Sequence, residues 1–213
     1  MLQLLLQGQI AVFILLLIAI VIALTFHEFG HAVTAKLYGD DTAERMGRLN
    51  LNPMSHIDPM GLLMVAIIGF GYAKPVITNP RNFTSRWASM VVAAAGPGMN
   101  LLLAIFTYNL YVFGLEQGWS LFIGDGPKFF FTYLSIINLV LMIFNLIPLG
   151  PLDGHYILPY LLPRHLAVKY QELNSRYGAG ALLILVALSV MGVPIFSFVI
   201  NLGSTILPYI TFV

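Results

Sequence analysis

The chain has 213 residues, of which 59% are hydrophobic and only 9% are charged. Soluble domains carry about 25% charged residues, so this composition excludes an ordinary soluble protein and predicts an integral membrane protein embedded in the lipid bilayer. The net charge of +1 gives no indication of a nucleic-acid partner, and the absence of cysteine means that any metal ion must be held by His and carboxylate side chains.

The first apolar segment, residues 8–38, is long enough to cross a membrane. Residues 1–7 lack the basic start and the small-residue cleavage site of a signal peptide, so we expect them to belong to the same helix. The segment ends at Gly39 and is followed by the acidic pair Asp40 and Asp41.

Three ionisable side chains lie close together inside this segment, in the sequence His27-Glu28-Phe29-Gly30-His31. Positions i and i+4 share one face of a helix, so both imidazoles can bind one metal ion while Glu28 holds the attacking water. Ionisable groups in hydrocarbon are costly and tend to mark function. The pattern predicts the centre of a zinc hydrolase near the C-terminal end of the span.

The region after the first span is predicted to be irregular. Residues 40–58 are polar, and prolines at 53 and 59 do not suit a helix interior. The apolar run 61–72 is shorter than the roughly 20 residues of a spanning helix, which favours a short or re-entrant element. Residues 74–80 are predicted to be extended because the prolines at 75 and 80 each push the preceding residue toward β geometry. Such backbone at membrane depth must be buried or line a wet cavity, so this region is the expected gate.

The second half of the chain contains further apolar segments. Residues 87–115 and 129–147 are predicted spans, and the uncharged tail 177–213 is either one long kinked span or two short ones. Prolines interrupt the chain between residues 148 and 163. The predicted fold class is an all-α polytopic membrane protein of one domain, residues 1–213. It should have about six transmembrane or partly spanning segments and a short re-entrant extended element.

The basic residues predict an orientation. With these spans, nine of the ten fall on one side, and only Lys128 is opposite. Positive charge accumulates in cytoplasmic loops, so we expect the histidines toward the cytoplasmic end of the membrane. The nine residues are Lys36, Arg45, Arg48, Lys74, Arg81, Arg86, Arg164, Lys169 and Arg176.

A third metal ligand must come from elsewhere, because catalytic zinc usually takes three protein ligands and a water. Asp153 is the first candidate, since a lone carboxylate in a proline-interrupted apolar segment is costly unless it is coordinated or paired. Glu172 is the alternative for a site with a Glu ligand, although its charged surroundings favour a solvated face. His155 and His56 are possible substitutes.

Three motifs in this order resemble the site-2 protease family of intramembrane zinc metalloproteases. They are His27-Glu28-x-x-His31, Gly96-Pro97-x-x-Asn100 and Asn145-x-x-Pro148-x-x-x-Leu152-Asp153-Gly154. The resemblance covers roughly residues 20–160. It implies one zinc ion per chain held by His27, His31 and Asp153, with Glu28 as the general base.

The resemblance also implies contacts with a substrate. Asn100 and Asn145 should lie near the active site, where they would help to bind substrate. His56 is a further candidate for substrate binding and belongs to a stretch that looks like one found in compact family members. A plain proline-rich turn, in which Asp58 caps the next helix, is about as plausible for this stretch as a catalytic role. Many family members carry a PDZ or CBS domain. These 213 residues show neither, so the chain resembles the minimal form.

The function implied is hydrolysis of peptide bonds within or next to the transmembrane segments of single-span membrane proteins. The expected location is a prokaryotic cell membrane, with the active site toward the cytoplasm. Residues 69–78 could offer an edge to which an unwound substrate adds as a strand. The main alternative is an ion or solute transporter with a metal site, because intramembrane ionisable groups and broken helices also describe ion pathways.

Overall fold

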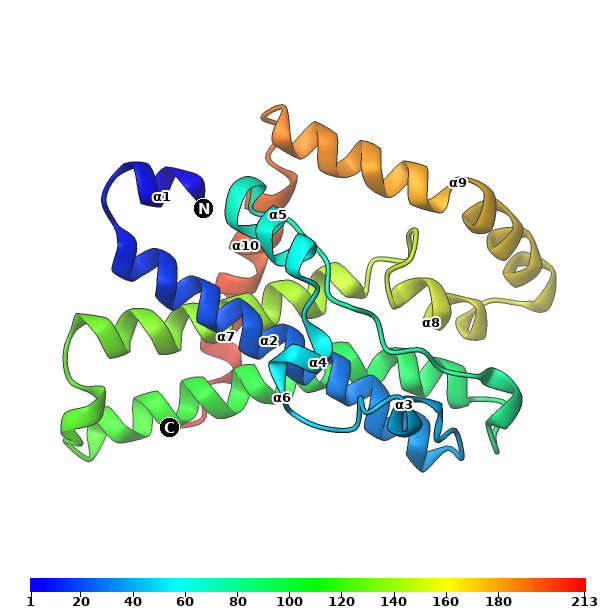
Figure 1. Cartoon of the computed structure of the whole chain (residues 1–213), viewed down its shortest axis with the longest axis horizontal. Helices are drawn as coiled ribbons and strands as arrows, with labels where there is room; N and C mark the ends of the chain where they lie inside the picture. The colour runs from blue at the N-terminus through cyan, green and yellow to red at the C-terminus, as the bar shows by residue number, and fades with distance from the viewer.

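The computed structural model describes all 213 residues, and its regular secondary structure is entirely helical (Figure 1). The helices are α1 (Leu2–Leu6), α2 (Ile10–Leu37), α3 (Thr42–Arg45), α4 (Pro53–His56), α5 (Pro59–Ile68), α6 (Ala88–Glu116), α7 (Asp125–Asn145), α8 (Gly154–Leu161), α9 (Arg164–Val190) and α10 (Ile195–Ile206). Short 3-10 turns are η1 (Pro80–Asn82), η2 (Ser120–Phe122) and η3 (Leu207–Ile210).

Four of these helices, α2, α6, α7 and α9, are long and apolar enough to cross a membrane. Two shorter apolar helices, α5 and α10 with its following turn, are too short to be counted with them. The all-helical, multi-span class is therefore confirmed, with four full-length candidate spans. The count of about six transmembrane or partly spanning segments and the re-entrant element stay predictions.

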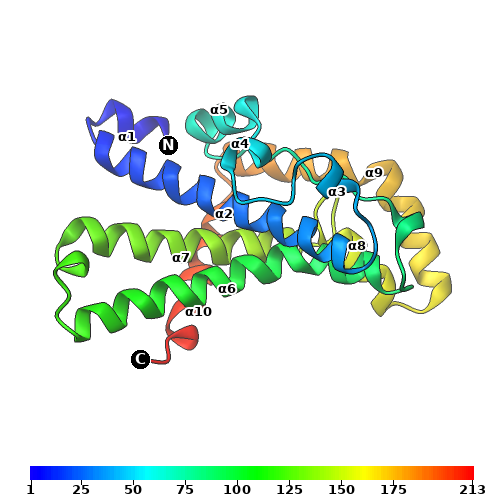
Figure 2. The same cartoon turned by 60° about the horizontal axis from the view of Figure 1, so that its bottom comes forward.

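The core of the molecule is formed by α2, α6 and α7, which lie side by side in both views (Figures 1 and 2). Small residues let α2 and α6 approach closely: a Cβ atom on Gly30 would lie 2.7 Å from the backbone oxygen of Ala95. Between α6 and α7, the hydroxyls of Thr107 and Ser135 are 2.9 Å apart. In lipid, helices associate through close contact of small residues and through interhelical hydrogen bonds. Moving an apolar side chain from lipid to a helix interface gives little free energy, because both surroundings are apolar.

The two ends of this bundle differ (Figure 2). The C-terminal end of α2, the N-terminal end of α6 and helix α8 lie at one end, and the connection from α6 to α7 lies at the other. The motif-bearing segments therefore meet at a single end of the bundle.

The N-terminal prediction is wrong. Residues 1–7 do not extend the first span but form the separate helix α1, because the chain turns at Gly8 with a φ of 72°. This left-handed conformation is open to glycine at little cost and ends a helix. The first span then runs from Ile10 to Leu37.

The region between α2 and α6 is largely irregular, as predicted. The apolar run after residue 58 forms helix α5, whose first turn is capped by Asp58, with its carboxylate accepting hydrogen bonds of 2.9 Å from the backbone N–H groups of Met60 and Gly61. The chain beyond α5 is extended as expected and pairs through an isolated antiparallel bridge between Ile57 and Ala73. The tail consists of α9, which begins within the polar stretch before residue 177, and α10.

Candidate active site

Two histidines of α2 form one side of the site. His27 and His31 are one helical turn apart, and their Nε2 atoms are 3.1 Å from each other. Helix α6 passes directly beside both rings at Gly96, where a Cβ atom would collide with Nε2 of His31 and lie 2.7 Å from Cε1 of His27. Glycine at this position therefore leaves the space that the two imidazoles occupy.

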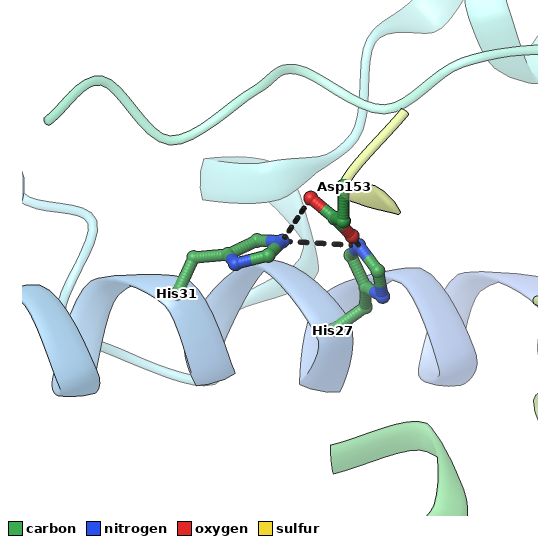
Figure 3. Close-up of side chains that lie close together, drawn as sticks. All are labelled: His27, His31 and Asp153. Carbon is green, nitrogen blue, oxygen red and sulfur yellow. Dashed lines mark hydrogen bonds and ion pairs between the residues drawn. The ribbon is translucent and has the colours of Figure 1, made fainter. Parts of the chain in front are cut away.

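Asp153 completes the cluster from the opposite half of the chain, immediately before α8 (Figure 3). Its Oδ2 lies 3.2 Å from Nε2 of His27, and its Oδ1 lies 3.4 Å from Nε2 of His31. The structure thus brings the three predicted zinc ligands together within 4.8 Å of one another.

The tautomer of His27 follows from its neighbour Asn100, which is fully buried. The amide nitrogen of Asn100 donates to the backbone oxygen of Ala23 at 3.0 Å and to Oδ1 of Asn138 at 2.8 Å. Its oxygen must therefore face Nδ1 of His27, 2.7 Å away, and accept the proton that Nδ1 carries. In the neutral ring, Nε2 then presents a lone pair.

His31 is held in the same tautomer by the backbone of α6. Its Nδ1 lies 2.7 Å from the carbonyl oxygen of Val92, and a carbonyl can only accept a hydrogen bond. Both Nε2 lone pairs therefore point at each other and at the carboxylate of Asp153, whose buried Oδ2 has no hydrogen-bond partner. Electron pairs gathered in this way repel one another unless a cation lies between them, so these residues fit a bound zinc ion.

The loop that carries Asp153 is clamped by α9. Asn174 of this helix accepts a hydrogen bond of 3.0 Å from the N–H of Gly150 and donates one of 3.1 Å to the carbonyl oxygen of the same residue. Its amide nitrogen also lies 2.8 Å from Nδ1 of His155, two residues beyond Asp153. Tyr170 adds a hydrogen bond of 3.0 Å to the carbonyl of Pro148. The position of the carboxylate therefore depends on contacts with a helix outside the core.

Glu28 is buried and extends toward the extended segment before α6. Its Oε2 accepts a hydrogen bond of 2.9 Å from the backbone N–H of Val76. Its other oxygen, Oε1, has no hydrogen-bond partner in the protein and is not among the fully buried atoms that lack one. This oxygen remains available to a water molecule.

The sequence profile of peptidase family M50 matches residues 15–123 and 116–191. This chain belongs to peptidase family M50. The site-2 protease resemblance carried by the three motifs is thereby confirmed, and the protein is a zinc metallopeptidase of the membrane.

Individual relatives agree with the family. The chain is 40% identical over 173 residues to the Bacillus subtilis protein named "Putative zinc metalloprotease YwhC". The aligned region covers 80% of this chain and 78% of that protein. It is 31% identical over 162 residues to "Putative zinc metalloprotease Rip2" of Mycolicibacterium smegmatis, covering 73% of this chain and 61% of the relative. The Rip2 protein of Mycobacterium tuberculosis is 29% identical over 158 residues, 71% of this chain and 59% of that protein. No solved structure matches the chain.

The residues predicted to bind substrate in this M50 peptidase have other contacts in the structure. Asn100 lies behind His27, with both ends of its amide engaged and no exposed surface, and its role toward a substrate stays a prediction. Asn145 ends α7 and donates a hydrogen bond of 3.0 Å to the carbonyl of Leu141 in its own helix. His56 is fully buried in α4, with Nε2 2.7 Å from the carbonyl oxygen of Asn50.

The alternative third ligands are not brought to the histidines. Glu172 is exposed on α9, and His155 is tied to Asn174. Three groups that complete the site are absent from the motif-based prediction: Asn138, Asn174 and the Val76 amide. Only Asn138 carries a signal in the sequence, as a polar side chain inside an apolar span. The other two sit in segments whose contacts depend on how the chain folds back.

Proposed function

We propose that the chain is an intramembrane endopeptidase that cuts membrane-anchored proteins within or next to their transmembrane segments. The observation that carries the proposal is the meeting of two Nε2 lone pairs and the Asp153 carboxylate at the end of the spanning helices. This arrangement fits one zinc ion per chain, held by His27, His31 and Asp153. A compact cluster of this kind favours hydrolysis over a transport pathway, whose ionisable groups would be spread along a route.

The chain's own residues supply the proton transfers. When bound, zinc would acidify a water molecule and polarise the scissile carbonyl. Glu28 would hold that water at Oε1, take its proton as the water oxygen attacks the carbonyl carbon, and pass the proton to the leaving amide nitrogen as the C–N bond breaks. The hydrogen bond from Val76 to Oε2 supports this role because it leaves only Oε1 free.

A substrate helix must unwind before it is cut, since each of its carbonyls is bonded within the helix. We propose that the unwound stretch pairs with the extended segment beside Glu28. The backbone N–H group of Ile77 has no partner in the protein and the residue is exposed, so the side of the segment opposite to the Val76 N–H is open to an added strand. This segment and α5 would then form the partly spanning, re-entrant part of the molecule.

The proposal is tested by co-expressing the chain with a panel of single-span anchored proteins and searching for cleavage products. Products should appear with the natural chain and not with Glu28→Gln, which should still bind close to one equivalent of zinc. Cleavage that persists in Glu28→Gln, or a purified chain without zinc, would contradict the proposal.

We also propose that the site faces the cytoplasm of a prokaryotic cell. The support for the cytoplasmic side is that nine of the ten basic residues fall on the site's side of the predicted spans, with only Lys128 opposite. A reporter inserted in the exposed turn at Gly47 should report a cytoplasmic location, and one inserted at Gly118 in the turn after α6 should report an external one. The reverse pattern would place the site on the outer face.

A further inference from the structure

An extended segment, residues 74–79, runs alongside α2 beside the active site, and we call it the strap (Figure 1). Three of its backbone N–H groups bind three different parts of the chain. Lys74 donates to the carbonyl oxygen of His56 at 2.8 Å, Val76 donates to Glu28 at 2.9 Å, and Asn79 donates to Asp40 at 2.6 Å. The strap is therefore attached at its start, its middle and its end.

Arg48 attaches the start of the strap. Its side chain is buried, and its guanidinium donates to the carbonyl oxygens of Ser55 and Lys74, the latter at 3.3 Å. No carboxylate lies within ion-pair distance of this guanidinium. A buried cation without a counter-ion is expensive, and here its charge is compensated only by backbone carbonyls that it joins together.

Asp40 attaches the end of the strap. Its carboxylate has no exposed surface and accepts four hydrogen bonds: from the N–H of Thr42 at 3.2 Å, the hydroxyl of Thr42 at 2.5 Å, the N–H of Asn79 at 2.6 Å and the amide of Asn82 at 2.8 Å. Burial alone would raise the pKa of Asp40, but these donors hold the pKa below its usual value. An ionised acceptor makes stronger hydrogen bonds than a neutral one, so this anchor is firm.

Between the two anchors, the strap presents the Val76 amide to Glu28. A Glu side chain rotates about three bonds, and this N–H is the one protein donor that binds its carboxylate. We infer that Arg48 and Asp40 are positioning residues of the proposed peptidase reaction, which hold the strap so that the Val76 amide keeps the Glu28 carboxylate in its working orientation. The inference rests on the proposed function, because it concerns the base of that reaction.

The expected effect of loosening the strap is on turnover. Without the Val76 hydrogen bond, Glu28 can rotate away from the water that it must deprotonate, and misplacement of a reacting group by about 1 Å can cost roughly 10²-fold in rate. The zinc ligands do not touch the strap anchors, so bound zinc should not change. This combination of lost turnover and retained zinc separates a positioning role from general damage to the fold.

The test compares variants of the purified chain, reconstituted in vesicles, on the substrate of the panel that is cut fastest. Arg48→Met and Val76→Pro should lower kcat by roughly 10²-fold with zinc retained. Arg48→Lys should recover part of kcat, since an ammonium can still reach one of the two carbonyls. Arg81→Met is the matched control, because the Arg81 guanidinium is exposed and makes no hydrogen bond.

Hydrogen exchange measures the strap itself. The bonded amides of Lys74, Val76 and Asn79 should exchange faster in Arg48→Met and in Asp40→Asn than in the natural chain, and Arg81→Met should match the natural chain. Unchanged exchange overturns the anchoring even if no substrate is cut. Exchange that rises without a fall in kcat, or a change in KM alone, overturns the positioning of Glu28.

Two further outcomes separate this inference from the proposed function. If Glu28→Gln cuts substrate as well as the natural chain, the proposed function fails and the inference fails with it. If Glu28→Gln is inactive while Arg48→Met and Val76→Pro keep a normal kcat, only the inference fails. Should Arg48→Met lose zinc through misfolding, Val76→Pro and Arg48→Lys decide the result.

Discussion

The two halves of the candidate zinc site are built in different ways. The histidine half is a single turn of α2 inside the core, and both rings are fixed from behind by α6, through Asn100 and the carbonyl of Val92. The Asp153 half is a proline-interrupted loop whose position is set by Asn174 of α9, a helix with few contacts to the core. The spacing of one helix therefore positions the two histidines, whereas Asp153 is positioned by contacts with Asn174, a residue distant in the sequence.

This difference suggests that the two halves tolerate change differently. The histidines can be displaced only by altering a tightly packed helix pair, whereas the carboxylate can move if a single side chain on α9 is lost. The experiments below change the ligands and then the supports of each half, beginning with the largest expected effect.

Removal of a ligand from either half should abolish the site. His27→Ala and Asp153→Ala should each lose most of the bound zinc and all detectable cleavage, because catalytic zinc needs three protein ligands. Glu28→Gln should keep zinc and lose roughly 10²–10⁴-fold in turnover. Zinc content measured by mass spectrometry checks both statements. Full occupancy in Asp153→Ala would remove that residue from the ligand set.

The histidine half is tested at its closest helix contact. Gly96→Ala should reduce bound zinc strongly, because the added methyl group would occupy the space of both imidazoles. Gly98→Ala is the matched control two positions along α6, where an added Cβ would meet nothing within 4 Å. Equal zinc binding by the two variants would show that α6 can move away from the histidines, and that α2 and α6 are not tightly packed at this point.

Loss of a supporting amide should have an intermediate effect in both halves. Asn100→Ala and Asn174→Ala should each weaken zinc binding by roughly 10–100-fold, as expected for residues that orient metal ligands. Asn100→Ala should also lower thermal stability more, since its amide bonds α2, α6 and α7 together. Asn201→Ala is the control, because this side chain is exposed and makes no hydrogen bond. Chelator titration gives the zinc affinities.

The smallest effect is expected at Glu172, the alternative third ligand. This residue is exposed on α9, two positions from the clamp. Glu172→Ala should leave zinc content and cleavage within about twofold of the natural chain, because the carboxylate lies outside the cluster and an exposed charge contributes little. Loss of bound zinc in Glu172→Ala would instead identify Glu172 as the third ligand.

Much of the protein follows from local sequence. Composition predicts a membrane protein, and residues 87–115 predict a span that the structure places at Ala88–Glu116. The spacing of His27 and His31 predicts a shared helix face. These predictions succeed because hydropathy and the helical period depend on neighbouring residues only. The prediction of a continuous N-terminal helix fails at Gly8, where a local turn overrides apolar composition.

The parts of the site that local sequence does not predict depend on contacts between distant segments. Asp153 could be chosen as a candidate because a buried carboxylate needs a partner, but its approach to the histidines depends on α9 folding back over the loop. Asn100 was expected near the site, yet its contact with His27 depends on how α6 is rotated against α2. The strap resembles any proline-containing linker in the sequence. Its hydrogen bonds to Glu28 and Asp40 arise only when the chain folds back alongside α2, because an extended segment has no internal hydrogen bonds and takes its position from its partners.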